Sequence, residues 1–201
     1  MSLDTSFDIK NILCSYFYNL RDTINLYNLN KDHQDNIIIR NLYSVEYRIY
    51  KLNQKIIEQN KYKYVERLNV FGNEKIKNVN HMKNTLKILN CSYSGIDQKG
   101  ISQLNLIKLS VFENKKIKNV NHMKKTLKIL KCGSDSAIDQ DSIVELNLIE
   151  LDATGNEKIK NVNHMKKTLK ILECGYNSGI GQHGISELNL IELDTIGNEK
   201  I

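Results

Sequence analysis

Cysteine is the residue type in this chain best suited to metal or redox chemistry, and the 201-residue sequence contains four. Three of them, Cys91, Cys132 and Cys174, recur at intervals of 41 and 42 residues, and Cys14 stands apart. None forms the CxxC pair that is typical of zinc sites. If the interval is that of a stacked repeat, equivalent cysteines lie about 9.6 Å apart, beyond the Cα separation of about 7 Å that a disulfide allows. We expect buried, unreactive thiols, with no metal site and no cofactor.

Histidines recur at the same intervals, at His81, His122 and His164, each inside the segment VNHMK. Each ligand of a zinc ion lies about 2.0 to 2.1 Å from it, so equivalent histidines at this spacing cannot share one. His183 has no Cys, Ser or acidic residue at a spacing that would pair a nucleophile with a base. The sequence therefore predicts no catalytic residue and a protein that is not an enzyme.

An internal repeat sets these intervals. The string NEKIKNVNHMK begins at Asn73, recurs as NKKIKNVNHMK at Asn114 and again as NEKIKNVNHMK at Asn156, and a fourth copy begins at Asn198. Each interval contains two apolar clusters, TLKIL-x-C and LNLI-x-L. The structural unit is therefore about 21 residues long, half the interval.

Each unit has the apolar spacing of a short strand. Seven units begin at Val65, Leu86, Leu106, Leu127, Leu148, Leu169 and Leu190, and a Leu follows three residues later in every unit. A small or β-branched residue comes two positions after that Leu, which is the alternation of a strand with one buried side. A single strand cannot bury that side alone. Stacked in register, the units would form a parallel sheet over one core.

A polar column follows the predicted strands. Five residues after the central Leu, the units carry Asn73, Ser94, Asn114, Asp135, Asn156, Asn177 and Asn198. We expect these side chains to satisfy backbone groups that are left unpaired where the chain turns away from the sheet. The column is thus predicted to be architectural.

The pattern Leu-x-x-Leu-x-Leu-x-x-Asn-x-x-Ile resembles the leucine-rich repeat family. The resemblance implies an α/β fold, a right-handed leucine-rich repeat solenoid with a parallel β-sheet on its concave face and about 21 residues per repeat. It covers residues 65–201, in about seven units of which the last is incomplete. The near-identical NEKI-x-x-VNHM and GI-x-Q-x-GI-x-x-LNLI-x-L segments also resemble leucine-rich repeat proteins of giant DNA viruses of the mimivirus group.

Residues 1–64 do not share the period and predict a small all-α module. One helix is expected near Ile9 to Leu20, another through Ile37, Ile38 and Leu42, and a last one along Val45, Ile49, Leu52 and Ile56. The last helix would cover the open edge of the first repeat.

The N-terminal order D-I-x-x-I-L-x-x-Y-F followed by R-D-x-I-N-L, over residues 7–42, resembles a divergent F-box. That resemblance implies a substrate receptor of a cullin-type ubiquitin ligase. It implies that Ile9, Ile12, Leu13 and Phe17 bind the ligase adaptor.

The concave face is the predicted binding surface, because its residues differ between units while the framework does not. Its first four units are basic to neutral, and its last three are acidic and could accept a basic partner segment. The predicted partner-binding residues are Phe71, Phe112, Glu150, Asp152, Ile171, Glu173, Glu192 and Asp194.

Lysines also stack, in the recurring IKN and HMK segments, and form basic stripes on the convex and edge surfaces. Phosphate backbones could be gripped there, although interspersed Glu and the lack of aromatic residues favour a solvated face. No apolar run reaches about 18 residues, and the N-terminal sequence lacks the order of a signal peptide, so we expect a cytoplasmic location, in the host cell if the protein is viral.

The sequence therefore predicts a non-enzymatic protein–protein interaction module, in its sharper form an F-box-type substrate receptor. The alternatives are a plain repeat scaffold with the N-terminal helices as a cap and, third, nucleic-acid binding through the lysine stripes. No membrane partner is expected.

Overall fold

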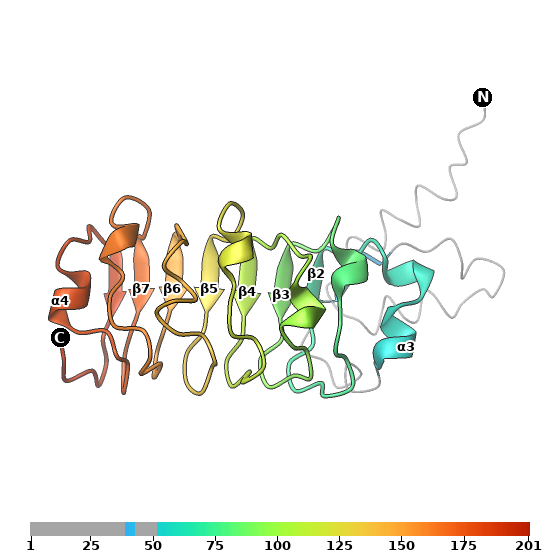
Figure 1. Ribbon diagram of the computed structural model, residues 1–201, viewed down its shortest axis with the longest axis horizontal. Helices are drawn as coiled ribbons and strands as arrows, with labels where there is room; N and C mark the ends of the chain where they lie inside the picture. Colours follow the sequence, from blue (N-terminus) through green and yellow to red (C-terminus); the bar gives the residue numbers. More distant parts are fainter. Residues whose placement is uncertain (1–38, 43–51) are drawn as a thin grey trace, which may run out of the picture.

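One eight-stranded parallel sheet forms the backbone of the structure, a computed structural model that describes residues 39–42 and 52–201. The strands follow one another in chain order along the long axis of the molecule (Figure 1). They are β1 (Asn41–Leu42), β2 (Arg67–Asn69), β3 (Ile88–Asn90), β4 (Lys108–Ser110), β5 (Ile129–Lys131), β6 (Glu150–Asp152), β7 (Ile171–Glu173) and β8 (Glu192–Asp194). Each unit therefore adds one short strand to the edge left by the unit before it, as in a repeat solenoid.

The register places the central leucines in one ladder. Leu68 pairs with Leu89, and the same column continues through Leu109, Leu130, Leu151, Leu172 and Leu193. All of them up to Leu172 are fully buried. The predicted inward positions are confirmed for β2–β7.

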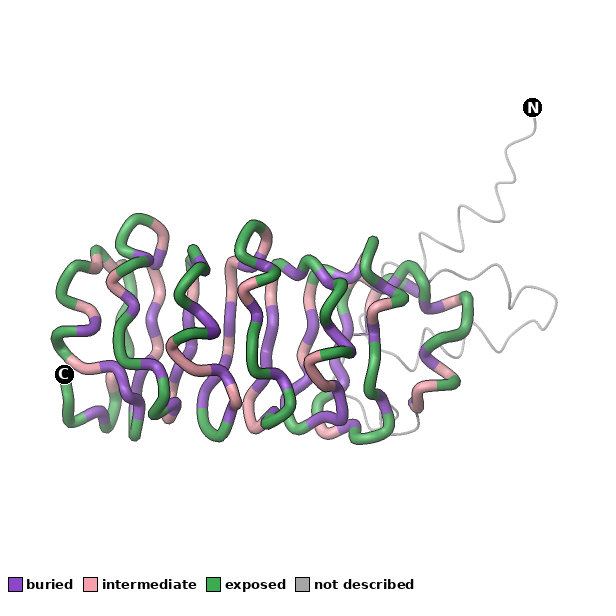
Figure 2. The backbone as a smooth tube through the Cα atoms, in the orientation of Figure 1, coloured by how far each residue is buried: buried purple, intermediate pink, exposed green. Residues whose placement is uncertain are grey.

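Short helical turns lie opposite the sheet and close the core. They are α3 (Gln54–Ile57), the 3-10 turns η3 (Asn60–Tyr62), η4 (Asn80–Met82), η5 (Lys99–Ile101), η6 (Asn121–Met123) and η7 (Asn163–Met165), and α4 (Gln182–Ile185). Met82, Met123 and Met165 reach inward from these turns and are fully buried. Figure 2 shows buried segments both along the strands and in the turns that face them. No helix within the described ranges has the length and apolar character needed to cross a membrane.

Four asparagines fill the polar column as predicted. Asn156 is buried, its Nδ2 donates to the carbonyls of Cys132 (2.7 Å) and Ile138 (3.1 Å), and its Oδ1 accepts from the N–H groups of Lys158 (2.9 Å) and Ile159 (3.3 Å). Asn73, Asn114 and Asn198 are also buried and also bond backbone groups of their own and the preceding unit. One amide thus joins each such unit to its neighbour.

The prediction for Asp135 and Asn177 is wrong. Both are exposed, and the buried position is taken one residue later by Ser136 and Ser178, whose hydroxyls accept from the N–H groups of Ile138 and Ile180. Their turns contain one more residue than the turn that ends at Ser94. Counting a fixed five positions from the leucine therefore misplaced the column.

Glutamines tie alternate units to the next unit along the array. The Oε1 of Gln98 accepts from the N–H groups of Lys118 and Asn119, both at 2.9 Å, and its Nε2 donates to the carbonyl of Asn119 (2.8 Å). Gln54 and Gln140 make the same three bonds one pair of units earlier and later. These bonds all end on main-chain atoms.

The sheet begins before residue 65. Asn41 and Leu42 pair in parallel with Arg67 and Leu68, and Leu42 is buried in the common core, so the helix predicted through Leu42 is wrong there. The predicted helix does not continue across Leu52, because the side chain of Asn53 accepts from the N–H of Ile56 and starts α3 at residue 54; Val45 and Ile49 lie outside the described residues. The first predicted helix lies outside the described residues.

The strand β8 is the exposed edge of the sheet. It pairs with β7, and all three of its residues are exposed. Leu193 is 43% exposed, although its equivalents in β2–β7 are fully buried, and Ile191 and Ile196 are 82% and 68% exposed. The apolar residues of this unit are therefore more exposed than their equivalents in β2–β7.

Candidate functional site

The repeated cysteines are structural. Cys91, Cys132 and Cys174 are buried free thiols, which confirms their predicted burial. Burial raises the pKa of all three thiols, that of Cys174 to about 11, so they stay protonated near neutral pH. Within residues 39–42 and 52–201, no three His, Cys, Asp or Glu side chains are grouped closely enough to hold a metal ion.

The repeated histidines link neighbouring units. The Nε2 atoms of His81, His122 and His164 lie 3.0, 3.2 and 3.1 Å from backbone carbonyls of the preceding unit, those of Ile57, Ile101 and Ile143. Burial lowers the pKa of His122 and outweighs the opposing effect of that hydrogen bond. A neutral imidazole that donates to a carbonyl has a structural role here.

The face of the sheet that points away from the core presents three rows of side chains. The register defines a first row of Arg67, Ile88, Lys108, Ile129, Glu150, Ile171 and Glu192 and a middle row of Asn69, Asn90, Ser110, Lys131, Asp152, Glu173 and Asp194. A third row follows two residues further along each unit, with Phe71, Ser92, Phe112, Gly133, Thr154, Gly175 and Ile196. All eight predicted partner-binding residues belong to these rows.

The middle row also shapes the backbone. Its acidic and amide oxygens accept from the N–H two residues later, as Asp152 does from Thr154 (3.2 Å) and Asp194 does from Ile196 (2.9 Å). Asn69 and Asn90 make the same bond. Asp152 is only 6% exposed, so this predicted partner-binding residue offers little surface.

Much of the predicted acidic cluster is neutralised internally. The Nζ of Lys131 lies 3.2 Å from Glu150, 3.7 Å from Asp152 and 3.4 Å from Glu173. Burial alone would lower the pKa of Lys131, but the three carboxylates together outweigh it and raise the pKa. Glu192 and Asp194, on β8, have no ion-pair partner in the described part of the chain.

An aromatic groove crosses the other half of this face. It is a hollow of about 390 Å³ lined by Phe71, Asn90, Ser92, Tyr93, Lys108, Ser110, Phe112 and Lys131. The rings of Phe71 and Tyr93 pack at a centroid distance of 5.2 Å and an angle of 56°. They are 44% and 48% exposed, so the groove offers apolar surface to solvent. Phe71 and Phe112 were predicted as binding residues, and the structure brings them together in one hollow.

Gly133 makes room for one wall of the groove. A Cβ atom there would lie 2.1 Å from Cε1 of Phe112 and 2.5 Å from the carbonyl oxygen of Thr154. Any side chain at residue 133 would therefore displace the Phe112 ring. The backbone N–H of Phe112 also donates to Ser92 Oγ (3.1 Å), which fixes the same segment.

Sequence reasoning missed Tyr93, and a signal for it existed. Tyr93 has a φ of 54° and directly precedes the buried Ser94. Gly72, Gly155 and Gly197 hold the corresponding place before Asn73, Asn156 and Asn198, also with positive φ. Glu113, Asp135 and Tyr176 also have positive φ in the turns of their units, so the backbone strain alone does not mark Tyr93. Its signal is an aromatic side chain at this turn position next to the unit that carries Phe71.

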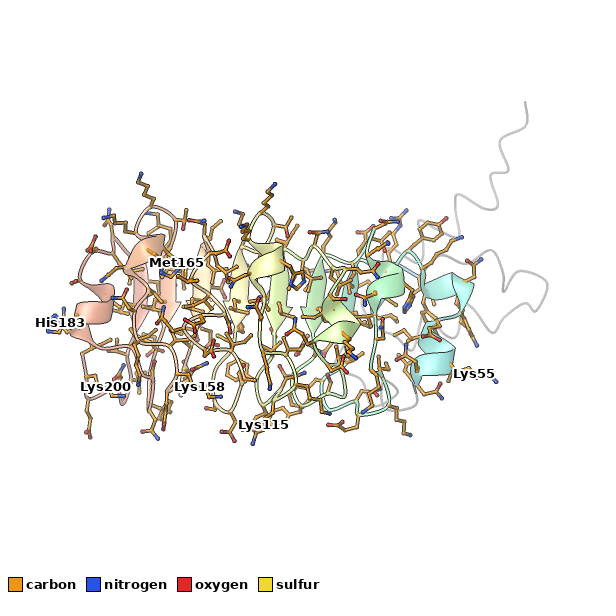
Figure 3. The ribbon with its side chains drawn as sticks, viewed as in Figure 1. Lys55, Lys115, Lys158, Met165, His183 and Lys200 are labelled. Carbon is orange, nitrogen blue, oxygen red and sulfur yellow. The ribbon has the colours of Figure 1, made fainter. Side chains whose placement is uncertain are left out.

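The lysine stripes are partly paired. Lys115 contacts Asp135 (3.1 Å), Lys116 contacts Glu74 (3.1 Å), and Lys124 and Lys166 contact Glu145 and Glu187. Lys115, Lys158 and Lys200 lie along one edge (Figure 3), where Lys158 and Lys200 donate to the carbonyls of Ser136 and Ser178. Because these lysine ammonium groups already have partners within the protein, fewer of them are available to bind phosphate groups.

A polar hollow of about 490 Å³ opens beside the same edge, between the turns after β5, β6 and β7. Asp135, Lys158 and Tyr176 line it. Asp135 and Lys158 already have the partners just named, so the aromatic groove is the better candidate.

The predicted adaptor-binding residues Ile9, Ile12, Leu13 and Phe17 lie outside the described residues. A scan against protein-family models finds no match for this chain, and neither does a search of curated proteins.

Proposed function

We propose that this protein is a leucine-rich repeat protein that binds other proteins through the face of its sheet and catalyses no reaction. The observation that carries the proposal is that the central leucines repeat from unit to unit, whereas the residues on the exposed face of the sheet differ. Leu109, Leu151 and Leu193 occupy equivalent positions, whereas the residue before each is Lys108, Glu150 and Glu192. A surface whose chemistry changes along an otherwise repeated framework suits recognition of a particular partner.

The face also has the two features that protein interfaces use. Exposed aromatic side chains gather in one half, at Phe71 and Tyr93. Carboxylates without an ion-pair partner among the described residues lie in the other half, at Glu192 and Asp194. Aromatic anchors supply much of the binding energy at interfaces, and charged groups at the rim select the partner.

The test is quantitative affinity capture with three folded variants. One changes the groove (Phe71→Ala with Lys108→Glu), one changes the acidic end (Glu192→Lys with Asp194→Lys), and a control changes exposed lysines after η6 and η7 (Lys125→Glu with Lys167→Glu). We expect a partner that is captured by the parent and the control and is lost with one of the face variants. Capture that all three variants retain, or that the control alone loses, would contradict the proposal.

The proposal extends to the N-terminal residues. Adaptor binding through Ile9, Ile12, Leu13 and Phe17 would make the protein a substrate receptor of a cullin-type ubiquitin ligase. Without it, the protein is a repeat scaffold whose N-terminal segment closes one end of the sheet.

A further inference from the structure

We propose that the aromatic groove binds an acidic peptide segment, with one aromatic or long aliphatic side chain against Phe71, Tyr93 and Phe112 and a neighbouring carboxylate on Lys108. This inference rests on the proposed protein-binding function and names the chemistry of the partner.

The size of the groove suits a short extended peptide. Its lining comes from the units of β2, β3, β4 and β5, and three strand spacings make about 14 Å. An extended chain covers that length with about four residues. Its volume of about 390 Å³ holds one or two large side chains.

The apolar part of the groove is formed before anything binds. Phe71 and Tyr93 pack on each other, and Phe112 lies over Gly133 with its backbone held by Ser92. Rings fixed in this way lose little freedom when they contact a ligand, which favours affinity. Ring edges and faces in this arrangement favour another aromatic ring or a long aliphatic chain.

Charge selects an acidic segment. Lys108 lines the groove and has no ion-pair partner among the described residues, whereas Lys131 at the other side is already held by three carboxylates. Arg67 and Lys108 flank Ile88 in the first row, so two cationic side chains lie on this part of the face. A carboxylate placed beside the rings would give Lys108 the partner it lacks.

Asn90 adds a donor for the peptide backbone. Its Oδ1 already accepts from the N–H of Ser92, and no described residue accepts from its Nδ2. That amide lies in the groove and can donate to a peptide carbonyl.

The experiment is a selection of randomised heptapeptides, displayed on phage, against the immobilised full chain. We expect enriched peptides with Asp or Glu within two positions of Phe, Tyr, Trp, Leu or Met. With Lys108→Glu the acidic preference should disappear and basic residues should replace it. The control Lys125→Glu makes the same change in net charge beyond η6 and should select the same peptides as the parent.

The best peptide is then synthesised with a fluorescent label and its Kd is measured by fluorescence polarisation. We expect Lys108→Glu to weaken binding by about tenfold or more, and Phe71→Ala by a similar factor. Lys108→Ala serves if the charge reversal fails to fold, as judged by circular dichroism.

Two results would overturn the inference. One contradicts only the acidic-peptide assignment, and the other also contradicts the proposed protein-binding function. Enriched peptides that are basic and depend on Glu192 and Asp194 would leave the protein-binding face in place and remove only this assignment. No enrichment, or enrichment that no face variant alters, would remove the proposed function as well.

Discussion

Tyr93 combines a left-handed backbone with exposure, as Tyr176 (φ 52°, 65% exposed) does, but of these two tyrosines Tyr93 is the one that lines the aromatic groove. A left-handed conformation costs a non-glycine residue about 1–2 kcal/mol. Three other units avoid this cost with Gly72, Gly155 and Gly197, whereas three more accept it with Glu113, Asp135 and Tyr176. The groove gains an aromatic wall at the expense of local stability.

We therefore predict that Tyr93→Gly stabilises the fold and weakens binding. The free energy of unfolding should rise by about 1 kcal/mol, since relief of the strain exceeds the loss of one exposed ring contact. Urea unfolding measures the first effect and the peptide Kd the second. Gly155→Tyr is the reverse control and should destabilise the protein; a Tyr93→Gly protein that is less stable than the parent would show that the ring, and not the backbone, dominates.

The corrected polar column gives a matched pair of variants. Asn156→Ala removes a buried amide with four backbone bonds, and we expect it to lower the free energy of unfolding by about 2–4 kcal/mol. Asn177→Ala, at an exposed residue that the sequence placed in the same column, should change it by less than about 0.5 kcal/mol. If chemical denaturation gave the two variants equal losses in the free energy of unfolding, Asn177 would belong to the polar column as first predicted.

Lys131 predicts how stability depends on alkaline pH. Its pKa is raised in the folded state above the ordinary value of 10.5, by three carboxylates that outweigh its burial. The stabilisation is therefore complete below 10.5 and is lost as the pH rises through the raised pKa. The Tm of the parent should fall more between about pH 10 and 12 than that of Lys131→Met. Parallel curves would mean that Lys131 is not coupled to these carboxylates.

The repeat unit is the next scale, and there each element depends on its neighbours. Strands of two or three residues have no stability of their own, so β2–β7 are each held by two neighbouring strands, and the edge strands β1 and β8 by one each. The central Leu193 of β8 is 43% exposed.

We predict that the array opens from this end. Backbone amides in residues 186–201 should exchange with solvent faster than those of β4 and β5, because opening the last unit breaks only one interface. Hydrogen exchange with mass spectrometry measures this in the full chain. Equal protection along the sheet would show that something else covers β8, such as a second copy in solution, which size-exclusion chromatography would detect.

At the scale of the whole molecule, the proposed binding of a ligase adaptor by the N-terminal residues can be tested directly. We expect the full chain to capture the eukaryotic ligase adaptor and expect Leu13→Asp with Phe17→Asp to abolish capture. Circular dichroism must show that the variant keeps its fold. No capture by the parent would leave a scaffold whose N-terminal segment closes the sheet.

The sheet was predictable from sequence because identical spacing recurs seven times. The register of Leu68 with Leu89 and their successors follows directly from that spacing. The strand at Asn41–Leu42 was missed because its unit lacks the repeated strings, and Asp135 was misplaced because a turn gained one residue. Ion pairs between side chains on neighbouring strands could not be predicted either. The sequence placed acidic residues together but did not show that Lys131 contacts three of them.

The hydrogen bonds by which glutamine and asparagine side chains join neighbouring units have a consequence for the gene. Each bridge ends on main-chain atoms, which are the same whatever residue follows, so a copied block fits beside any other block. Gln98 and Gln140 occur in every second unit and Asn114 and Asn156 in the units between. A duplication or deletion of 42 residues, the distance from Asn114 to Asn156, keeps this alternation, whereas a single-unit change sets two like units side by side. A gain or loss of two repeats would therefore leave the hydrogen bonds between the remaining units unchanged, and under the proposed function it would lengthen or shorten the binding face without any adjustment of the rest.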